Sequence, residues 1–365
     1  MPALPSLLQP SIVNERVSRL KVTNNTLQVA LGMQAGGPAV RKTASRRGSY
    51  DVFNDTREVA TMRLPGASAA TVARQPVGNV TFTIPRSAEK VPILLEEVNQ
   101  LRAIGGPVDG VDELGEQYIL DQERIQKQRY TALREFQIAS MLRGSYTYTQ
   151  SGDDLVHSFS GGTYTVNYRV PAGNKSQLDM LGGGDIIGTT WSNAAAPIVR
   201  DLLQINAAMT QLVGMGLTDV WVSSVVWGHI ITNTEVLNLA GSVNNPVKSF
   251  ERNMDTNEAV AELNGAPWVK FHITDNGLSI GGVFYKLISD TLAVFTCKMG
   301  NDIVSYYECA EPILDPGTQR TSNEYGEYYY YKAVDDPVQY ELHARFNGMP
   351  VLKVPSAIAC GTVVF

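Results

Sequence analysis

Hydrophobic and polar positions change their spacing several times along the chain, and each change marks a different predicted element. The longest uniform stretch runs from Asp112 to Gly144, contains no proline and consists mostly of strong helix formers. Glu123 stands four residues before Lys127, the order that favours a helix, and Gly144 is placed to end it. The pattern predicts a single helix over 112–143, roughly 48 Å long.

The apolar stripe along this predicted helix is uneven. Polar Asp121, Gln128 and Arg129 interrupt it, so a coiled-coil seam is not sustained. Apolar side chains become dense only after Tyr130. We therefore expect the C-terminal half of the helix to be buried on the protein's own β-sheet and the N-terminal half to face neighbouring molecules.

Short β-prone runs precede the helix and alternate with breakers. Three runs predict strands: 50–53, 57–64 and 78–85. Between the last two lies a stretch of small and polar residues typical of a loop. An isolated two-stranded excursion is marginally stable in water, so we expect this one to be supported by neighbouring subunits.

The segment 1–48 has prolines at 2, 5 and 10 and little that builds a core, which predicts an extended arm with a short helix at 12–20. Behind the long helix, aromatic strands are expected within 146–168, followed by a region of α/β character. The further predicted elements are a helix at 195–213, a strand at 219–226, a helix through 230–239, a short helix at 255–264, a hairpin turning at 275–277, and strands at 290–298, 328–334 and 339–346.

Composition indicates a folded chain, and its charge is unevenly distributed. Of the 365 residues 44% are hydrophobic and 18% are charged, and the net charge is −6. Residues 1–50 hold seven Lys or Arg and one acid, a net charge of +6, so the rest of the chain carries −12. A basic arm on an acidic body can bind nucleic acid or the acidic face of another copy, or it can be a solvated tail.

The sequence shows no sign of membrane insertion or secretion. It contains no apolar run long enough to span a bilayer, and no signal peptide is expected. The three cysteines, without CxxC spacing, indicate reduced thiols in the cytosol, the alternative being one disulfide with one free thiol.

Candidate chemistry is sparse. The four histidines are far apart without metal-ligand spacing, and GxSxG, HExxH and CxxC motifs are absent. The glycine run 182–184 lacks the Lys-Ser/Thr of a phosphate-binding loop. We interpret His229 and His272 as structural, and the tyrosines at 328–331 as a strand with rings on both faces rather than a platform for bases. No catalytic, cofactor or metal residue is predicted.

Several short motifs follow one another in a recognisable order. They are FTIP at 82–85, LRAIGG at 101–106, ASMLRGSY at 139–146, YEL at 340–342 and PVLKVP at 350–355. Together with the basic arm, the β excursion and the long helix, this order resembles the lambda-type (protein E) major capsid proteins of tailed bacteriophages, which have the HK97 fold. The resemblance is spread over most of 45–365, whereas 1–45 and 320–346 match little.

The resemblance implies an α+β fold of HK97 type with a defined domain order. Its parts would be an N-terminal arm (1–48), an E-loop (49–91), a P domain with the spine helix 112–143 and a β hairpin (92–184), an A domain (185–335) and return strands to the P domain (336–365). Some proteins of this fold join the E-loop to a neighbour by a Lys–Asn isopeptide bond. Because 49–84 contains no lysine, we expect no such cross-link here.

The implied function is that of a virion structural protein without enzymatic activity. Pentamers and hexamers of the chain would assemble in the host cytoplasm into the icosahedral head that encloses the double-stranded DNA of a tailed phage. Scaffold, portal and decoration proteins are possible partners, DNA would be contacted non-specifically, and no membrane is involved. The alternatives are an encapsulin-like compartment of the same fold and an α/β enzyme with its catalytic domain at 185–310.

Contacts between subunits are expected from basic side chains of the arm, the excursion and the long helix. The predicted residues are Arg16, Arg19, Arg41, Arg46, Arg47, Arg57, Arg63, Arg74, Arg124 and Lys127. They would partly neutralise the acidic body of adjacent copies.

Overall fold

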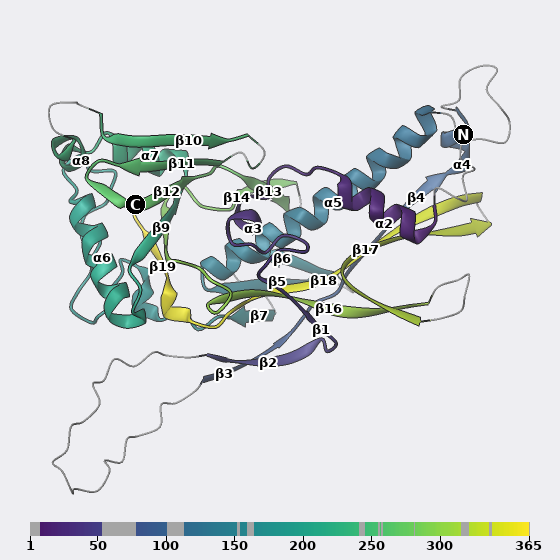
Figure 1. The fold of residues 1–365 in the computed structure, drawn as a ribbon, viewed down its shortest axis with the longest axis horizontal. Coiled ribbons are helices and arrows are strands. Elements are labelled where there is room, and N and C mark those ends of the chain that lie inside the picture. The colour runs from purple at the N-terminus through teal and green to yellow at the C-terminus, as the bar shows by residue number, and fades with distance from the viewer. Residues whose placement is uncertain are drawn as a thin grey trace, which may run out of the picture. The chain divides into compact units, whose positions relative to one another are not determined.

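The structure is a computed structural model, and its helices and strands fall into two compact units (Figure 1). The described residues are 8–52, 78–100, 113–151, 154–158, 164–240, 245–254, 256, 258–280, 282–314, 321–335 and 338–364. The first unit consists of Met1–Arg47, Thr83–Glu135 and Tyr306–Met349, and the second of Gly48–Phe82, Phe136–Ser305 and Pro350–Phe365.

The first unit is built on a five-stranded sheet with the order β1-β16-β17-β18-β4. The strands are β1 (Val40–Thr43), β4 (Ser87–Leu94), β16 (Val304–Leu314), β17 (Thr321–Asp335) and β18 (Val338–Leu352). β17 and β18 form a long antiparallel pair that keeps one register from Gly326 opposite Asn347 to Asp335 opposite Val338. β1 pairs in parallel with β16.

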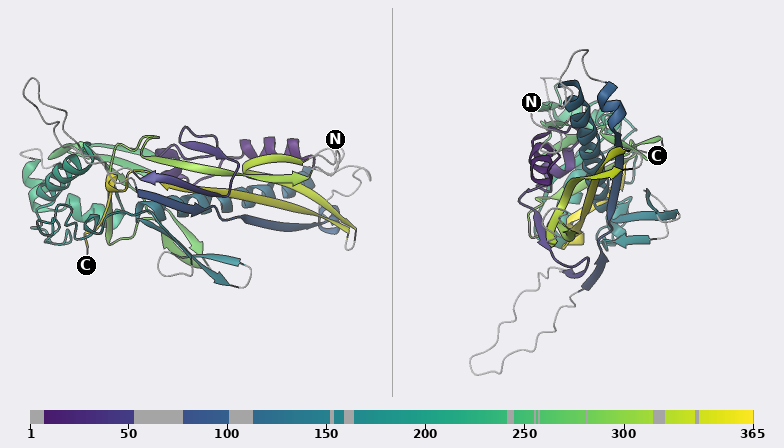
Figure 2. Two further views of the ribbon diagram at one scale, coloured as in Figure 1. Left: turned by 90° about the horizontal axis from the view of Figure 1, so that it is seen from below. Right: turned by 90° about the vertical axis from the view of Figure 1, so that its right-hand side faces the viewer.

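The long helix α5 (Glu113–Leu142) runs beside these paired strands (Figure 1 and Figure 2). Tyr130 fixes it to them, because its hydroxyl donates to the carbonyl of Ala344 at 2.6 Å and its ring stacks on Phe346 at 5.6 Å. Side chains alternate across a strand, so Tyr329 faces the helix while Tyr330 faces the opposite side. The predicted spine helix and the tyrosine strand are both confirmed.

The N-terminal segment is folded in the first unit. It forms α2 (Pro10–Arg19) and α3 (Thr26–Ala30) ahead of β1, and α2 packs on β17. The short helix expected at 12–20 is therefore confirmed, and the extended arm is wrong for the described residues from 8 onward. A further helix, α4 (Leu95–Gln100), follows β4.

The second unit contains a seven-stranded sheet with the order β10-β11-β12-β9-β15-β19-β8. Its strands are β8 (Lys175–Ser176), β9 (Leu217–Val222), β10 (Val247–Asn253), β11 (Glu258–Leu263), β12 (Ala266–Ile273), β15 (Leu292–Cys297) and β19 (Ile358–Thr362). The helix α6 (Ile198–Val213) packs its apolar stripe on this sheet and ends at Gly214, whose φ of 86° suits a glycine. The helix predicted at 195–213 is confirmed.

Smaller elements complete the second unit. They are α7 (Ser224–Ile231), α8 (Thr234–Leu239), the sheet β6-β5-β7 (Asp154–Ser158, Ser145–Ser151, Tyr164–Asn167), the β2–β3 pair (Arg47–Val52, Gly78–Thr83), the β13–β14 hairpin (Gly277–Ile280, Val283–Lys286), and the 3-10 turns η1 (Ala172–Asn174) and η3 (Pro355–Ala357). The expected aromatic strands within 146–168 are confirmed. The strand predicted at 57–64 lies outside the described residues.

Three local predictions are wrong. The expected helix at 255–264 is replaced by β11, because pairing with β10 and β12 overrides the helix preference of its Ala and Glu residues. The strand predicted to reach 226 ends at Val222, where the Ser223 hydroxyl caps α7 by accepting from the Val226 amide at 3.4 Å. The hairpin forms from β13 and β14, beyond the expected turn at 275–277.

Sheet membership also differs from the predicted domain order. β4 and β16 were not predicted as strands, and β16 and β17 belong to the five-stranded sheet of the first unit. The segment 306–335 therefore belongs to the first unit, together with 1–47 and 83–135. It does not belong with the α/β region that begins at 185. The assignment of named capsid-protein domains to these segments stays a prediction.

Candidate assembly sites

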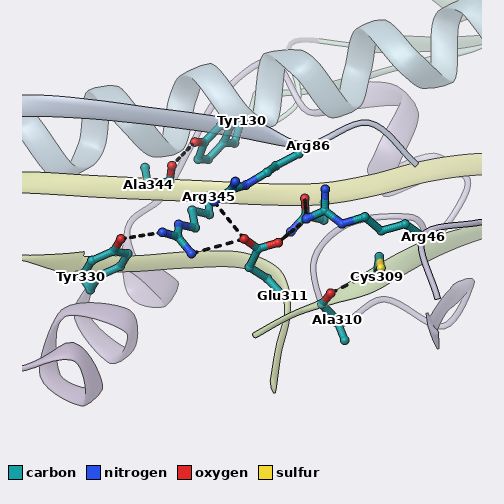
Figure 3. Close-up of polar contacts among 10 residues, drawn as sticks. Arg46, Arg86, Tyr130, Cys309, Ala310, Glu311, Tyr330, Ala344 and Arg345 are labelled. Carbon is teal, nitrogen blue, oxygen red and sulfur yellow. Dashed lines mark hydrogen bonds and ion pairs between the residues drawn. The ribbon is translucent and has the colours of Figure 1, made fainter. Parts of the chain in front are cut away.

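Three arginines from separate parts of the first unit bind one carboxylate, that of Glu311 on β16 (Figure 3). Arg86 lies 3.0 Å and Arg345 3.2 Å from its Oε1. Arg46 binds Oε2, and the Asn347 side-chain amide donates to the same oxygen at 3.1 Å. Each oxygen of Glu311 therefore has two polar partners, and the side chain is only 8% exposed.

This Glu311 cluster stands where the chain leaves and re-enters the first unit. The first unit is left after Arg47 and resumed at Thr83, so Arg46 and Arg86 lie just outside the two ends of that excursion. The backbone amide of Ile84 donates to the carbonyl of Arg46 at 2.9 Å and holds the two ends together. One buried carboxylate therefore binds side chains from both ends.

Arg345 extends the cluster along the sheet. Its guanidinium donates to the Tyr330 hydroxyl at 2.8 Å and lies over the ring of Tyr330, 5.2 Å from the centroid. His343 stacks on the same ring at 4.9 Å. The ring of Tyr330 is therefore engaged by protein groups, and Tyr329 is buried toward α5, which supports the strand interpretation of the tyrosine run over base stacking.

A second set of polar contacts attaches α2 to α5. Arg16 pairs with the buried carboxylate of Glu123, with Nε 2.8 Å from Oε2, and the Tyr331 hydroxyl donates to the same carboxylate at 3.1 Å. Lys127 places its ammonium 2.6 Å from the carbonyl of Val17 and 2.7 Å from that of Leu20, at the C-terminal end of α2. Burial of this ammonium lowers the pKa of Lys127. Cations suit this helix end, whose carbonyls have no partners within the helix.

A third set lies about two turns further along α5. Arg134 is completely buried and donates to the carbonyl of Met33 at 2.9 Å and to the carboxylates of Glu308 at 3.0 Å and Glu327 at 3.3 Å. Glu135 accepts two backbone amides from the first turn of α3, at 3.1 and 2.9 Å. Arg134 and Glu135 belong to the C-terminal half of α5, which was expected to be buried. The expectation that the N-terminal half faces neighbouring molecules is wrong at Glu123 and Lys127, because both bind the chain's own N-terminal segment.

The structure gives the predicted contact residues different environments. Arg16, Arg46 and Lys127 bind partners within the chain, as described above. Arg19 pairs with Glu15 and Arg124 with Asp121, both at the surface, while Arg41 and Arg47 are exposed. Arg57, Arg63 and Arg74 lie outside the described residues. A role of these residues in contacts between copies stays a prediction.

Sequence reasoning missed three of the arginines that matter most here. Arg86 directly follows the FTIP motif, and its position after the predicted strand was a usable signal. Arg345 lies within a predicted strand, where its alternation with His343 already placed both on one face. Nothing local distinguishes Arg134 from other helix-surface arginines, because its burial depends on residues more than 100 positions away.

The second unit contains a histidine held between two carboxylates. His272 on β12 places Nδ1 2.5 Å from Glu258 and Nε2 2.9 Å from Asp219, and its ring stacks on Trp221 at 4.1 Å. Burial by itself lowers the pKa of His272, but the two hydrogen-bonded carboxylates outweigh it and raise that pKa. Because only the imidazolium can donate to both carboxylates, the group acts as an ion-paired connection between three strands.

Large apolar side chains are exposed at two places in the second unit. Phe250 on the edge strand β10 is 57% exposed, Met254 just after it is 77% exposed, and Phe284 on β14 is 62% exposed. Exposed apolar groups on an edge strand are typical of surfaces that another chain covers.

Other classes of site find no support in the described parts of the chain. None of their His, Cys, Asp and Glu residues form a group suited to a metal ion. All three cysteines are free and buried, as the reduced-thiol interpretation expected. Among the described helices, none combines the length and hydropathy that crossing a bilayer requires.

Comparison with known proteins places the chain in a family. Residues 31–363 match the family described as Phage major capsid protein E. No curated protein matches the sequence. Among solved structures, a prophage capsid protein from Escherichia coli CFT073 aligns over 100% of both chains with a TM-score of 0.58 at 14% identity.

Two further solved structures are more distant. A phage-related protein from Bordetella bronchiseptica RB50 gives a TM-score of 0.49 at 11% identity, covering 96% of each chain. An encapsulin complex from Synechococcus elongatus PCC 7942 gives 0.42 at 12% identity, covering 88% of this chain and 84% of that one. The first structure, with its TM-score above 0.5, shares the fold of this chain. With the family match over nearly the whole sequence and the HK97-type fold, the chain belongs to the phage major capsid protein E family.

Proposed function

We propose that this chain forms the icosahedral head of a tailed phage, assembled from pentamers and hexamers around double-stranded DNA. The observation that carries the proposal is the family match over residues 31–363. Proteins of this family form capsid shells and are structural proteins rather than enzymes, so the α/β enzyme alternative is excluded. The chain is accordingly a component of the virion.

The surfaces described above fit a subunit that is completed by its neighbours. The edge strand β10 presents exposed Phe250, and the β14 strand presents exposed Phe284. Exposed apolar side chains of this kind do not stabilise a monomer, whereas a shell would bury them between copies.

The domain assignment that accompanies this proposal follows the family. Residues 49–91 would be the E-loop lying on a neighbour, α5 the spine of the P domain, and the seven-stranded sheet the core of the A domain. Assembly in the host cytoplasm, guidance by a scaffold, entry of DNA through a portal and covering by a decoration protein belong to the same proposal. DNA would be contacted through phosphates without sequence readout.

The test is expression of the full chain, with scaffold supplied where needed, followed by size-exclusion chromatography and negative-stain electron microscopy. Closed shells or ring-shaped capsomers are expected, and a chain that elutes only as monomers or dimers under both conditions contradicts the proposal. Particles purified from infected cells should contain packed DNA. Shells that contain protein cargo and no genome would instead identify an encapsulin-like compartment. Shells boiled in detergent should run as monomers, since 49–84 contains no lysine.

A further inference from the structure

The Glu311 cluster has more cations than its own carboxylate can neutralise. Arg46, Arg86 and Arg345 all bind Glu311, and Arg86 and Arg345 share a single oxygen of it. Their guanidinium groups are therefore close neighbours that repel one another. The side chains of Arg46 and Arg86 are 36% and 43% exposed, so the excess charge is accessible from solvent.

The surrounding strands do not supply the missing negative charge. Glu324 stands opposite Glu311 in the β16–β17 ladder, and within the described residues no ion pair joins it to the three arginines. Glu341, further along the sheet, is already bound by Lys90 at 2.9 Å and by His343 at 3.0 Å. Even with Glu324 counted, cations outnumber carboxylates at the cluster.

Arg86 is the member that the fold of the subunit needs least. Glu311 accepts from Arg46, Arg345 and Asn347 without it, so both oxygens stay bonded when Arg86 is removed. In the described part of the chain Glu311 is the one polar partner of Arg86, through a single guanidinium nitrogen. A guanidinium has five N–H donors, and those that remain can bind a second oxyanion.

We propose that Arg86, together with Arg46, binds a carboxylate supplied by a second copy of this chain. This inference rests on the proposed shell, in which every subunit is surrounded by copies of itself. The chain is acidic, with a net charge of −6, and residues 51–365 carry −12, so each neighbour brings many carboxylates. Charge complementarity of this kind orients subunits and makes assembly depend on salt.

The direct test uses Arg86→Lys, which keeps the charge and introduces an amine that carbodiimide couples to a contacting carboxylate. Shells are assembled from a mixture of ¹⁵N-labelled and unlabelled subunits, cross-linked and analysed by mass spectrometry. Peptides that join Lys at position 86 of one isotope to an Asp or Glu of the other are expected. The matched control is Arg200→Lys on α6, whose side chain is 64% exposed and which should give no link between copies at position 200. Links from position 86 to Glu311 of the same chain alone would overturn the proposal.

A second variant, Arg86→Gln, tests the same contact without cross-linking. We expect unchanged thermal unfolding of the dispersed subunit, and a subunit concentration for assembly raised roughly fivefold, with a weaker dependence on salt. Arg200→Gln removes the same charge and should leave assembly unchanged. Wild-type assembly behaviour of Arg86→Gln, or a loss of subunit stability, contradicts the inference. So does normal assembly with reduced DNA content, which would point to phosphate. A wild type that forms no particles would instead contradict the proposed function.

Discussion

Arg134 offers the sharpest test of how the N-terminal segment is attached to the spine helix. Its side chain has no exposed surface, and its two terminal nitrogens contact Glu308, Glu327 and the carbonyl of Met33. The substitution Arg134→Met keeps much of the length and the apolar stem while removing the charge. It leaves two carboxylates, 7% and 14% exposed, without their cation.

The size of the effect follows from two opposing contributions. Removing one partner from a buried ion pair costs about 3–5 kcal/mol, because the other charges stay buried and unpaired. Within the described structure, however, the buried Nε of Arg134 has no hydrogen-bond partner. The substitution also removes this unpaired donor, which offsets part of the loss of stability. We therefore expect a loss near the lower end, about 3 kcal/mol, which shifts the folding equilibrium roughly a hundredfold.

The measurement is urea unfolding of the dispersed subunit, followed by circular dichroism. The control is Arg129→Met on the same helix, because Arg129 is 59% exposed and pairs with Glu89 at the surface. Loss of such a surface ion pair should lower the free energy of unfolding by at most about 1 kcal/mol. The variant R134M/E308Q/E327Q also removes the two carboxylates left without a cation, and it should recover part of the lost stability. Equal, small losses for R134M and R129M would refute the reasoning, as would a triple variant less stable than R134M by itself.

Three further predictions concern single positions. His272 has a raised pKa because both ring nitrogens bind carboxylates, so its stabilisation is complete below about pH 6.5 and is lost as pH rises through the folded pKa. Thermal unfolding from pH 6 to 9 should show this fall in the wild type and not in His272→Gln; parallel curves would count against it. Burial raises the pKa of Asp201 to about 6, so Asp201→Asn should stabilise by up to about 3 kcal/mol at pH 7 and not at all below pH 4, as urea titrations at both pH values can show. Gly326 has a φ of 73°, and an added Cβ would lie 2.6 Å from the Glu308 carboxyl carbon, so Gly326→Ala should cost more than about 1 kcal/mol in the same assay. An unchanged urea midpoint would contradict this last prediction.

The elements that sequence reasoning found share strong local signals. The spine helix has 30 residues of favourable composition, and α6 carries a regular apolar stripe, so both could be read without tertiary information. Where local preference and tertiary pairing disagree, the reasoning failed. β11 consists largely of helix formers, yet it is a strand because β10 and β12 flank it on both sides.

Charged positions were harder to interpret than apolar ones. The spacing of charged residues along the sequence does not show which residues the fold brings together. Arg46 and Arg86 are 40 positions apart in sequence and both bind Glu311, more than 200 positions further on. The net charge of the first fifty residues predicted binding to nucleic acid or to the acidic face of another copy, and this stays a prediction. Net charge could not show that some of these basic residues pair within the same chain, as Arg16 does with Glu123.

The interrupted stripe of the spine helix is where this matters most. Polar residues in its first half ruled out a coiled coil, and from that we inferred a surface left for neighbouring molecules. The interruption was real, but in that half Glu123 and Lys127 bind the N-terminal segment of their own chain. These polar contacts act together with apolar side chains of the same segment, since Val13, Val17 and Leu27 are buried as well. The segment is therefore held by both kinds of contact, and it occupies part of the helix surface that we expected neighbouring molecules to cover.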